Sequence, residues 1–155
     1  MTAYFLDTSA IVKRYLPEVG TIWIRGLVDP AAGNVIIVSE ITVVEVAAAL
    51  AARHRATDGI SQRERDAGLA LFRSHHATEY EVVTLNHAIL DEAVELTQRH
   101  RLRGYDAVQL ASALAGNASL AAAGRAGLTF IASDSDLIAA ASAEGLPGDN
   151  PLHHP

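Results

Sequence analysis

Short apolar runs alternate with longer amphipathic stretches along the whole chain. The runs 4–6, 35–39, 81–85 and 129–133 predict buried strands, because continuous apolar residues are typical of strands covered on both faces. The stretches between them favour helices, expected at 9–16, 21–28, 42–56, 61–76, 86–100, from 106 onward, and from 135 to about 144. Strands that alternate with helices predict an α/β fold, a three-layer α/β/α sandwich with a central, mainly parallel sheet.

The length of 155 residues fits one domain, which we expect to span 1–145. The remaining tail, 146–155, holds three of the five prolines and shows no clear element. The absence of cysteine excludes disulfides and thiolate metal sites. The amino-terminal residues carry neither a basic segment nor a long apolar run, and no stretch predicts a membrane span. We therefore expect a cytoplasmic protein that does not associate with membranes.

Four acidic residues occupy similar places in the predicted elements. Asp7 ends the first strand and Asp134 follows the last. Glu45 lies in the first turn of the helix after the second strand, and Asp106 opens a later helix. Ligands of parallel sheets bind beyond the carboxyl ends of the strands. We expect all four carboxylates at that edge.

Helix capping offers a second explanation for three of these acids. Thr42 and Glu45 match the spacing of a capping box. Asp106 is a candidate N-cap, and either Asp134 or Asp136 could cap the last helix. Asp7 is different, because a carboxylate beside the core loses its hydration and needs a partner.

A bound cation explains the four acids as a set. Four separate carboxylates at one edge would repel one another and raise their pKa values. An all-oxygen ligand set favours Mg²⁺, with Mn²⁺ as a substitute. Divalent ions coordinated in this way can support hydrolysis of a phosphodiester bond by an activated water.

Four segments carry a resemblance to a known family. Residues 5–10, 39–46, 104–111 and 130–137 are similar, in this order, to the motifs of PIN-domain nucleases, specifically the VapC-type toxins of toxin–antitoxin pairs. The acids that match the motifs are Asp7, Glu45, Asp106 and Asp134. The resemblance implies an endoribonuclease that acts on RNA with Mg²⁺ or Mn²⁺, forms a homodimer and is inhibited by a cognate antitoxin protein. It also implies that these four acids are both catalytic residues and metal ligands.

Three further residues are predicted to support the acids. Thr8 and Ser9 supply hydroxyls that could orient Asp7 or a water, although Ser9 could instead cap the first helix. Asp136 is a candidate ligand or orienting acid, but a cap of the last helix is the favoured interpretation. Gln109 lies one turn beyond Asp106 and is expected to be a packed or solvated amide.

The basic residues are few, and the formal net charge is −6. This charge argues against a broad basic surface. Candidate contacts to RNA phosphates are Lys13, Arg14, Arg101 and Arg103. Two alternatives stay open: a catalytically idle PIN module that binds RNA or a protein, and a related metal-dependent DNA nuclease.

Overall fold

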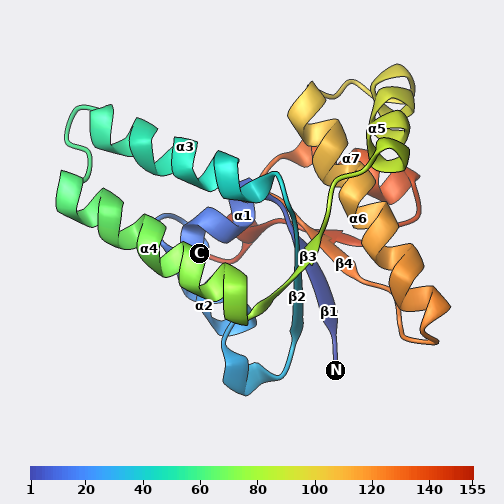
Figure 1. Ribbon diagram of the computed structural model, residues 1–155, viewed down its shortest axis with the longest axis horizontal. Helices are drawn as coiled ribbons and strands as arrows, with labels where there is room; N and C mark the ends of the chain where they lie inside the picture. Colours follow the sequence, from blue (N-terminus) through green and yellow to red (C-terminus); the bar gives the residue numbers. More distant parts are fainter.

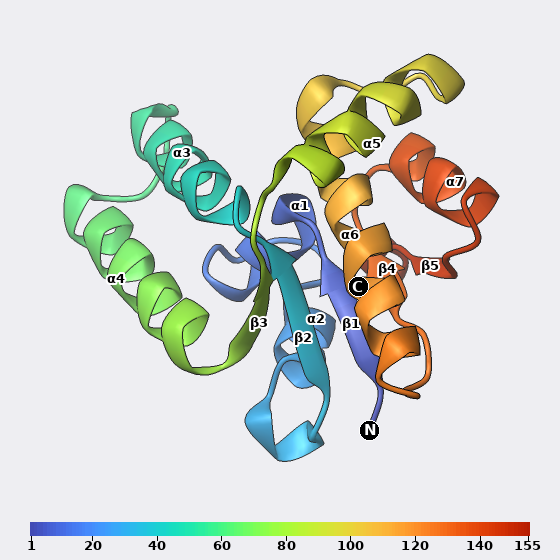
Figure 2. The ribbon, with the colours of Figure 1, turned by 45° about the vertical axis from the view of Figure 1, so that its right-hand side comes forward.

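The computed structural model describes residues 1–155 as a parallel sheet between two layers of helices (Figures 1 and 2). The strands are β1 Ala3–Leu6, β2 Val35–Ser39, β3 Tyr80–Val83, β4 Thr129–Ile131 and β5 Gly148–Asp149. Their order across the sheet is β3-β2-β1-β4-β5, and every neighbouring pair is parallel. The predicted three-layer α/β/α architecture is confirmed.

The predicted helices are all present. The helices of the structure are α1 Thr8–Ile11, η1 Val12–Arg14, α2 Thr21–Leu27, η2 Pro30–Ala32, α3 Thr42–Arg55, α4 Gln62–Thr78, α5 His87–Arg99, α6 Gly104–Ala122, α7 Ser135–Ala143 and η3 Pro151–His153, of which the short 3-10 turns η2 and η3 were not predicted. The first predicted helix divides into α1 and the 3-10 turn η1. Helix α6 begins two residues before Asp106. None of the helices is both long and apolar enough to cross a membrane.

Two hydrophobic cores lie on opposite faces of the sheet. One contains Phe5 and Phe130, whose rings stack 5.6 Å apart, and packs against α5, α6 and α7. The other contains Leu6 and Phe72 and packs against α1, α2, α3 and α4. Successive residues of β1 enter different cores, as the period of two of a strand requires. This double coverage explains the continuous apolar runs of the central strands.

The order of the strands reverses around β1. The chain moves from β1 to β2 and β3 on one side, and later returns to place β4 and β5 on the other. The connections after β1 and β4 therefore leave the sheet in different directions, which opens space beyond their carboxyl ends. Asp7 follows β1 directly, and Asp134 lies between the end of β4 at Ile131 and the start of α7 at Ser135.

The tail at 146–155 corrects the expectation of no clear element. Gly148 and Asp149 form the edge strand β5, which pairs with β4, and η3 follows. The η3 turn contacts α2, where Trp23 stacks on His154 with ring centroids 4.1 Å apart. A strand of two residues contains no hydrophobic alternation, so the sequence pattern does not reveal it.

Candidate active site

Asp7 follows β1 directly and its side chain is only 5% exposed. Its Oδ1 accepts hydrogen bonds from Ser9 Oγ at 2.6 Å and from the Ala10 amide at 3.0 Å. Burial raises the pKa of Asp7 to about 7, because the charged form loses hydration. The two hydrogen bonds oppose this increase, whereas the charges of Asp106 and Glu45 add to it.

Glu45 does not form the capping box that its spacing suggested. Helix α3 has no side-chain N-cap, and the Glu45 carboxylate instead faces two other elements. Its Oε1 accepts hydrogen bonds from Thr8 Oγ1 at 3.0 Å and from Gln109 Nε2 at 2.6 Å. Gln109 Nε2 also lies 3.1 Å from Thr42 Oγ1. The hydroxyl of Thr42 is thus part of this network and not a helix cap.

Asp106 lies in the first turn of α6, where it is half-buried. It is not the N-cap, because the helix begins at Gly104 after Arg103. Burial raises its pKa, and the neighbouring charge of Asp134 raises it further. The charge and the backbone amide of Arg103 act in the opposite direction.

Asp134, and not Asp136, is the N-cap of the last helix. Its Oδ1 accepts hydrogen bonds from the amides of Asp136 at 2.8 Å and Leu137 at 3.2 Å. The extended backbone of Asp134 suits this position. Asp136 lies inside the first turn of α7 with an exposed side chain, which corrects the favoured interpretation of that residue.

The four acids form a row of neighbours. Glu45 contacts Thr8, the residue after Asp7, and Gln109, which lies one helical turn from Asp106. Asp106 and Asp134 line the same cavity. A cavity of about 430 Å³ opens at one end of this row. Its lining residues are Arg101, Leu102, Arg103, Asp106, Asp134 and Asp136. The structure therefore brings the predicted acids to one edge of the sheet.

The donor set fits a hard divalent cation in its chemistry. Asp7 and Asp134 accept all their hydrogen bonds through Oδ1, which leaves Oδ2 of each carboxylate available. No group of three or more acidic or histidine side chains converges closely enough to hold a metal ion by itself. Mg²⁺ commonly uses only one or two carboxylates and keeps several waters. The row thus suits a partly hydrated ion better than a closed protein cage.

The predicted basic contacts divide into two pairs. Arg101 and Arg103 are exposed and line the acidic cavity. Lys13 is only 3% exposed, and its Nζ lies 2.8 Å from Glu18 Oε2. Arg14 bonds to Glu79, beside the first residue of β3, at the opposite edge of the sheet. The structure brings only Arg101 and Arg103 to the acids.

Gln109 is the member of the site that sequence reasoning undervalued. Its side chain is 2% exposed, and its Oε1 is buried without a hydrogen-bond partner. Besides Glu45, its Nε2 contacts Thr8 Oγ1 at 3.2 Å. The spacing from Asp106, one helical turn, was the only signal that it could face the site.

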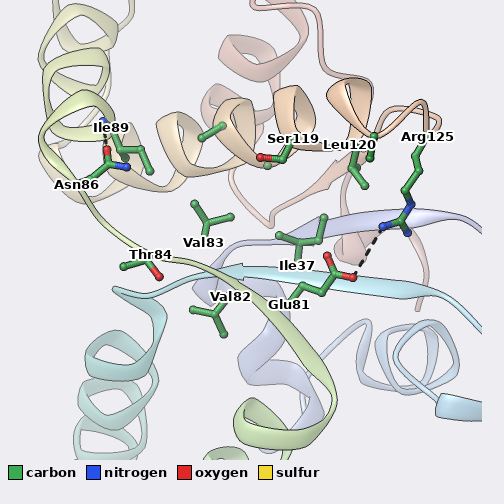
Figure 3. A pocket seen from close by; sticks show the side chains of 13 residues that line it. Ile37, Glu81, Val82, Val83, Thr84, Asn86, Ile89, Ser119, Leu120 and Arg125 are labelled. Atoms are coloured by element: carbon green, nitrogen blue, oxygen red, sulfur yellow. Dashed lines mark hydrogen bonds and ion pairs between the residues drawn. The ribbon is translucent and has the colours of Figure 1, made fainter.

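A second cavity, of about 480 Å³, lies away from this row (Figure 3). It runs between the edge strand β3 and the second half of α6, and its walls include Ile37, Val83 and Leu120. Its only acid, Glu81, is paired with Arg125 at 3.9 Å. The acidic side chains are therefore concentrated at the smaller, polar cavity.

The fold and the row of acids define an α/β protein with a carboxylate site at the switch point of a parallel sheet. The family model described as "PIN domain" matches residues 4–143. The chain belongs to the PIN domain family. No curated protein matches its sequence.

Several solved structures share this fold. VapBC2 of Rickettsia felis, bound to a promoter DNA fragment, has a TM-score of 0.63 at 16% identity and covers 96% of this chain and 98% of its own. VapC20 of Mycobacterium tuberculosis, described as a toxin that cleaves the sarcin-ricin loop, has a TM-score of 0.60 at 21% identity and covers 92% and 95%. FitAcB of Neisseria gonorrhoeae has a TM-score of 0.60 at 16% identity and covers 97% and 99%.

Proposed function

We propose that this chain is a Mg²⁺-dependent endoribonuclease, the toxin of a toxin–antitoxin pair. The observation that carries the proposal is the row of four carboxylates at the switch point of a PIN-family sheet. Repulsion within the row leaves the protein with unfavourable negative charge, which a divalent cation would neutralise. The similarity of the fold to VapC20, described as a toxin that cleaves the sarcin-ricin loop, supports RNA as the substrate class in this proposal.

Each acid has a distinct place in this proposal. Asp7, Asp106 and Asp134 would hold the ion, with Glu45 completing the acidic set. When bound, Mg²⁺ would polarise the scissile phosphate and lower the pKa of a coordinated water. Thr8 and Gln109 keep the carboxylate of Glu45 directed into the site through their hydrogen bonds.

Arg101 and Arg103 are the best candidates to bind the substrate. Both line the cavity that contains Asp106 and Asp134, so a phosphate bound by the guanidinium groups would lie beside the acids. Such contacts position a strand without reading its sequence. Lys13 and Arg14 are not part of this proposal, because their charges are already paired with Glu18 and Glu79.

The test is cleavage of transfer RNA, messenger RNA and single-stranded DNA by the purified chain. We expect RNA cleavage that requires Mg²⁺, is lost in EDTA and is restored by Mn²⁺. Asp7→Asn should abolish cleavage, whereas Asp66→Asn, which changes an exposed acid of α4, should not. Activity that survives EDTA would exclude the metal mechanism. Cleavage of DNA alone would favour the DNA nuclease, and no cleavage at all would favour the idle binding module.

The proposed function includes two protein partners. Structures with this fold include VapBC toxin–antitoxin complexes, which supports inhibition of this chain by a cognate antitoxin. A homodimer is proposed with it, and a cytoplasmic location would give the protein access to RNA. Purification with the product of a neighbouring open reading frame should yield an inactive complex. Light scattering on the isolated chain should give the mass of two chains, and the mass of one would exclude the dimer.

A further inference from the structure

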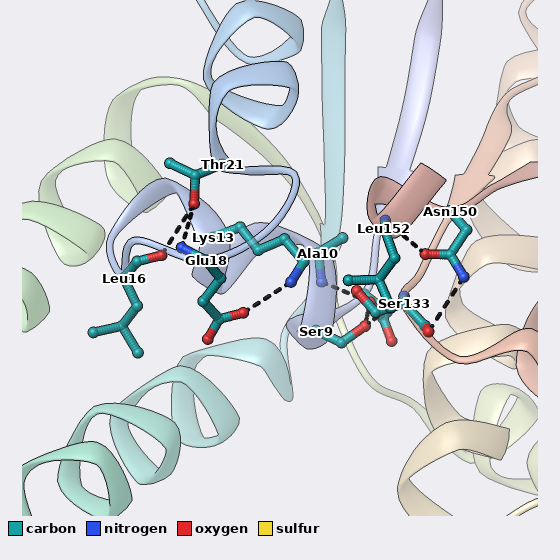
Figure 4. A network of polar contacts seen from close by, with 10 residues as sticks. Ser9, Ala10, Lys13, Leu16, Glu18, Thr21, Ser133, Asn150 and Leu152 are labelled. Carbon is teal, nitrogen blue, oxygen red and sulfur yellow. Dashed lines mark hydrogen bonds and ion pairs between the residues drawn. The ribbon is translucent and has the colours of Figure 1, made fainter. Parts of the chain in front are cut away.

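Three hydrogen bonds, which meet at the backbone of Ser133, link the carboxyl-terminal segment to Asp7; Figure 4 shows Asn150, Ser133 and Ser9. Asn150 Nδ2 donates to the carbonyl of Ser133 at 3.3 Å. The Ser133 amide donates to Ser9 Oγ at 2.9 Å, and Ser9 Oγ donates to Asp7 Oδ1 at 2.6 Å. Four residues that follow β5, β4 and β1 thus connect the tail to the most deeply buried acid of the site.

The two polar side-chain atoms of Asn150, Oδ1 and Nδ2, make different hydrogen bonds. Its Oδ1 accepts from the Leu152 amide at 2.9 Å and caps η3. This cap accounts for the acceptor but not for the Nδ2 contact to Ser133. The side chain is buried, so the donor has no solvent alternative. The second contact fixes the peptide group that joins Ser133 to Asp134.

Ser133 lies between two of the acids. Its amide holds the hydroxyl of Ser9, which in turn orients Asp7. Its carbonyl belongs to the peptide that leads into Asp134. The amide and the carbonyl belong to successive peptides that meet at the Ser133 Cα. A change in the backbone dihedral angles of Ser133 would therefore alter both the peptide that leads into Asp134 and the amide that holds the Ser9 hydroxyl. Backbone hydrogen bonds from Asp7 to Ile131 and from Ala132 to Asp149 hold the strands on either side.

The tail is itself fixed at several points. His154 Nε2 contacts both carboxylate oxygens of Asp149 at 3.0 Å, and the His154 ring stacks on Trp23. The backbone amide of Asn150 also donates to Asp149 Oδ1 at 2.7 Å. These contacts keep Asn150 in one orientation, so it can restrain Ser133 instead of following its movements.

We propose that Asn150 is a positioning residue for the acidic site, acting on Asp7 and Asp134 through Ser133 and Ser9. The inference rests on the proposed ribonuclease function. Its structural part, the restraint of the Ser133 peptide, can be measured without any activity. Asn150 itself touches neither the acids nor the substrate cavity.

The central variant is Asn150→Ser, which keeps a neutral cap for η3 but lacks the amide donor. We expect kcat to fall about fivefold, with KM for RNA changed by less than about twofold, since the substrate contacts are intact. The Ser133 amide should shift in a ¹H–¹⁵N spectrum and exchange faster with solvent. Asn150→Asp, which also caps η3 without the donor, should show the same change in the Ser133 amide.

The matched control is Asn34→Ser. Asn34 Nδ2 donates to the Leu27 carbonyl at 2.9 Å, before the start of β2 and at the opposite edge of the sheet. Its loss should lower the melting temperature without changing kcat or the Ser133 amide. If Asn150→Ser behaves in the same way, Asn150 is only a structural cap and the proposal is wrong.

A double substitution tests the route of the effect. In a Ser9→Ala background the link to Asp7 is already broken, so Asn150→Ser should lower kcat by clearly less than about fivefold. Full additivity of the two losses would exclude the path through Ser9. If the unmodified chain cleaves no RNA, the proposed function fails. The Ser133 amide then decides the positioning role alone: an unchanged resonance in Asn150→Ser rejects it, and a shifted one supports it.

Discussion

Asp7 carries the largest electrostatic penalty among the acids of the site. A carboxyl group ordinarily titrates near pH 4, whereas burial raises the pKa of Asp7 to about 7 in the folded protein. Between these values the folded state binds more protons than the unfolded state. Stability therefore falls as the pH rises from about 4 to about 7, and the penalty is fully present above pH 7.

Removal of this charge should stabilise the metal-free protein at pH 8. Asp7, and not Ser9, is the N-cap of α1, since its side chain accepts from the Ala10 amide. Asparagine keeps the size of Asp7 and this acceptor, so Asp7→Asn should raise stability by roughly 1–3 kcal/mol. Thermal unfolding in EDTA at pH 8 and pH 5 measures this, and the gain should shrink at the lower pH. An Asp7→Asn protein that melts below the unmodified chain at pH 8 would contradict a buried, strained carboxylate.

Gln109 should control the orientation of Glu45. In Gln109→Leu the Glu45 carboxylate keeps only its bond to Thr8 and loses the contact at 2.6 Å. We expect RNA cleavage to fall about tenfold or more, because a misdirected acid weakens the site. Gln98→Leu, at an exposed amide of α5, is the control and should leave cleavage unchanged. Equal rates for the two variants would show that Thr8 alone is sufficient.

Single residues also mark the limit of what the sequence pattern reveals about the site. The four acids could be predicted because each follows a strand or opens a helix in a parallel fold. The choice between Asp134 and Asp136 as the cap could not, since both residues have the same intrinsic preference. The backbone conformation at the end of β4 decides it in favour of Asp134. Likewise, the capping-box spacing of Thr42 and Glu45 competes with tertiary contacts to Gln109, which prevail.

At the scale of elements, hydrophobic patterning predicts every α-helix and four of the five strands, but not the 3-10 turns η2 and η3. Each of the recognised elements is amphipathic or continuously apolar over a long enough stretch. The hydrophobic pattern does not predict strand β5, because only Gly148 and Asp149 form it and neither belongs to a hydrophobic core. Its pairing with β4 and the contacts of η3 with α2 are long-range features that local sequence does not encode.

The contact between η3 and α2 makes Gly20 critical. Gly20 has a φ of +88°, and a Cβ atom there would lie 2.5 Å from the Pro151 carbonyl. Gly20→Ala should therefore destabilise the protein by about 2–4 kcal/mol, through strain and displacement of the tail.

Gly33→Ala separates the backbone strain from the displacement of the tail. Gly33 also has a positive φ, +67°, but a Cβ atom added there would have no neighbour within 4 Å. Its substitution should cost only the backbone strain, about 1–2 kcal/mol. Chemical denaturation of both variants measures the difference. Equal losses of unfolding free energy in the two variants would show that η3 can move away at no cost and does not stabilise α2.

For the whole molecule, a net charge of −6 and only two arginines at the acidic cavity predict weak electrostatic attraction for RNA. Each phosphate neutralised on a single strand contributes about 0.7 to the slope of log affinity against log salt concentration. With contacts from Arg101 and Arg103 alone, the slope should be about 1.4. This is much shallower than expected for a protein with an extended basic surface.

Arg103→Ala should test this account of substrate binding directly. It should raise KM, reduce the salt slope by about 0.7 and change kcat less than KM. Because Arg103 also lowers the pKa of Asp106, part of the loss should reappear as a changed metal requirement at low pH. Arg73→Ala, at an exposed position of α4, should leave both KM and the slope unaltered. An unchanged salt slope in Arg103→Ala would mean that RNA approaches the acids along another surface. Only the placement of the acids at the switch point would then still connect the fold with the proposed reaction.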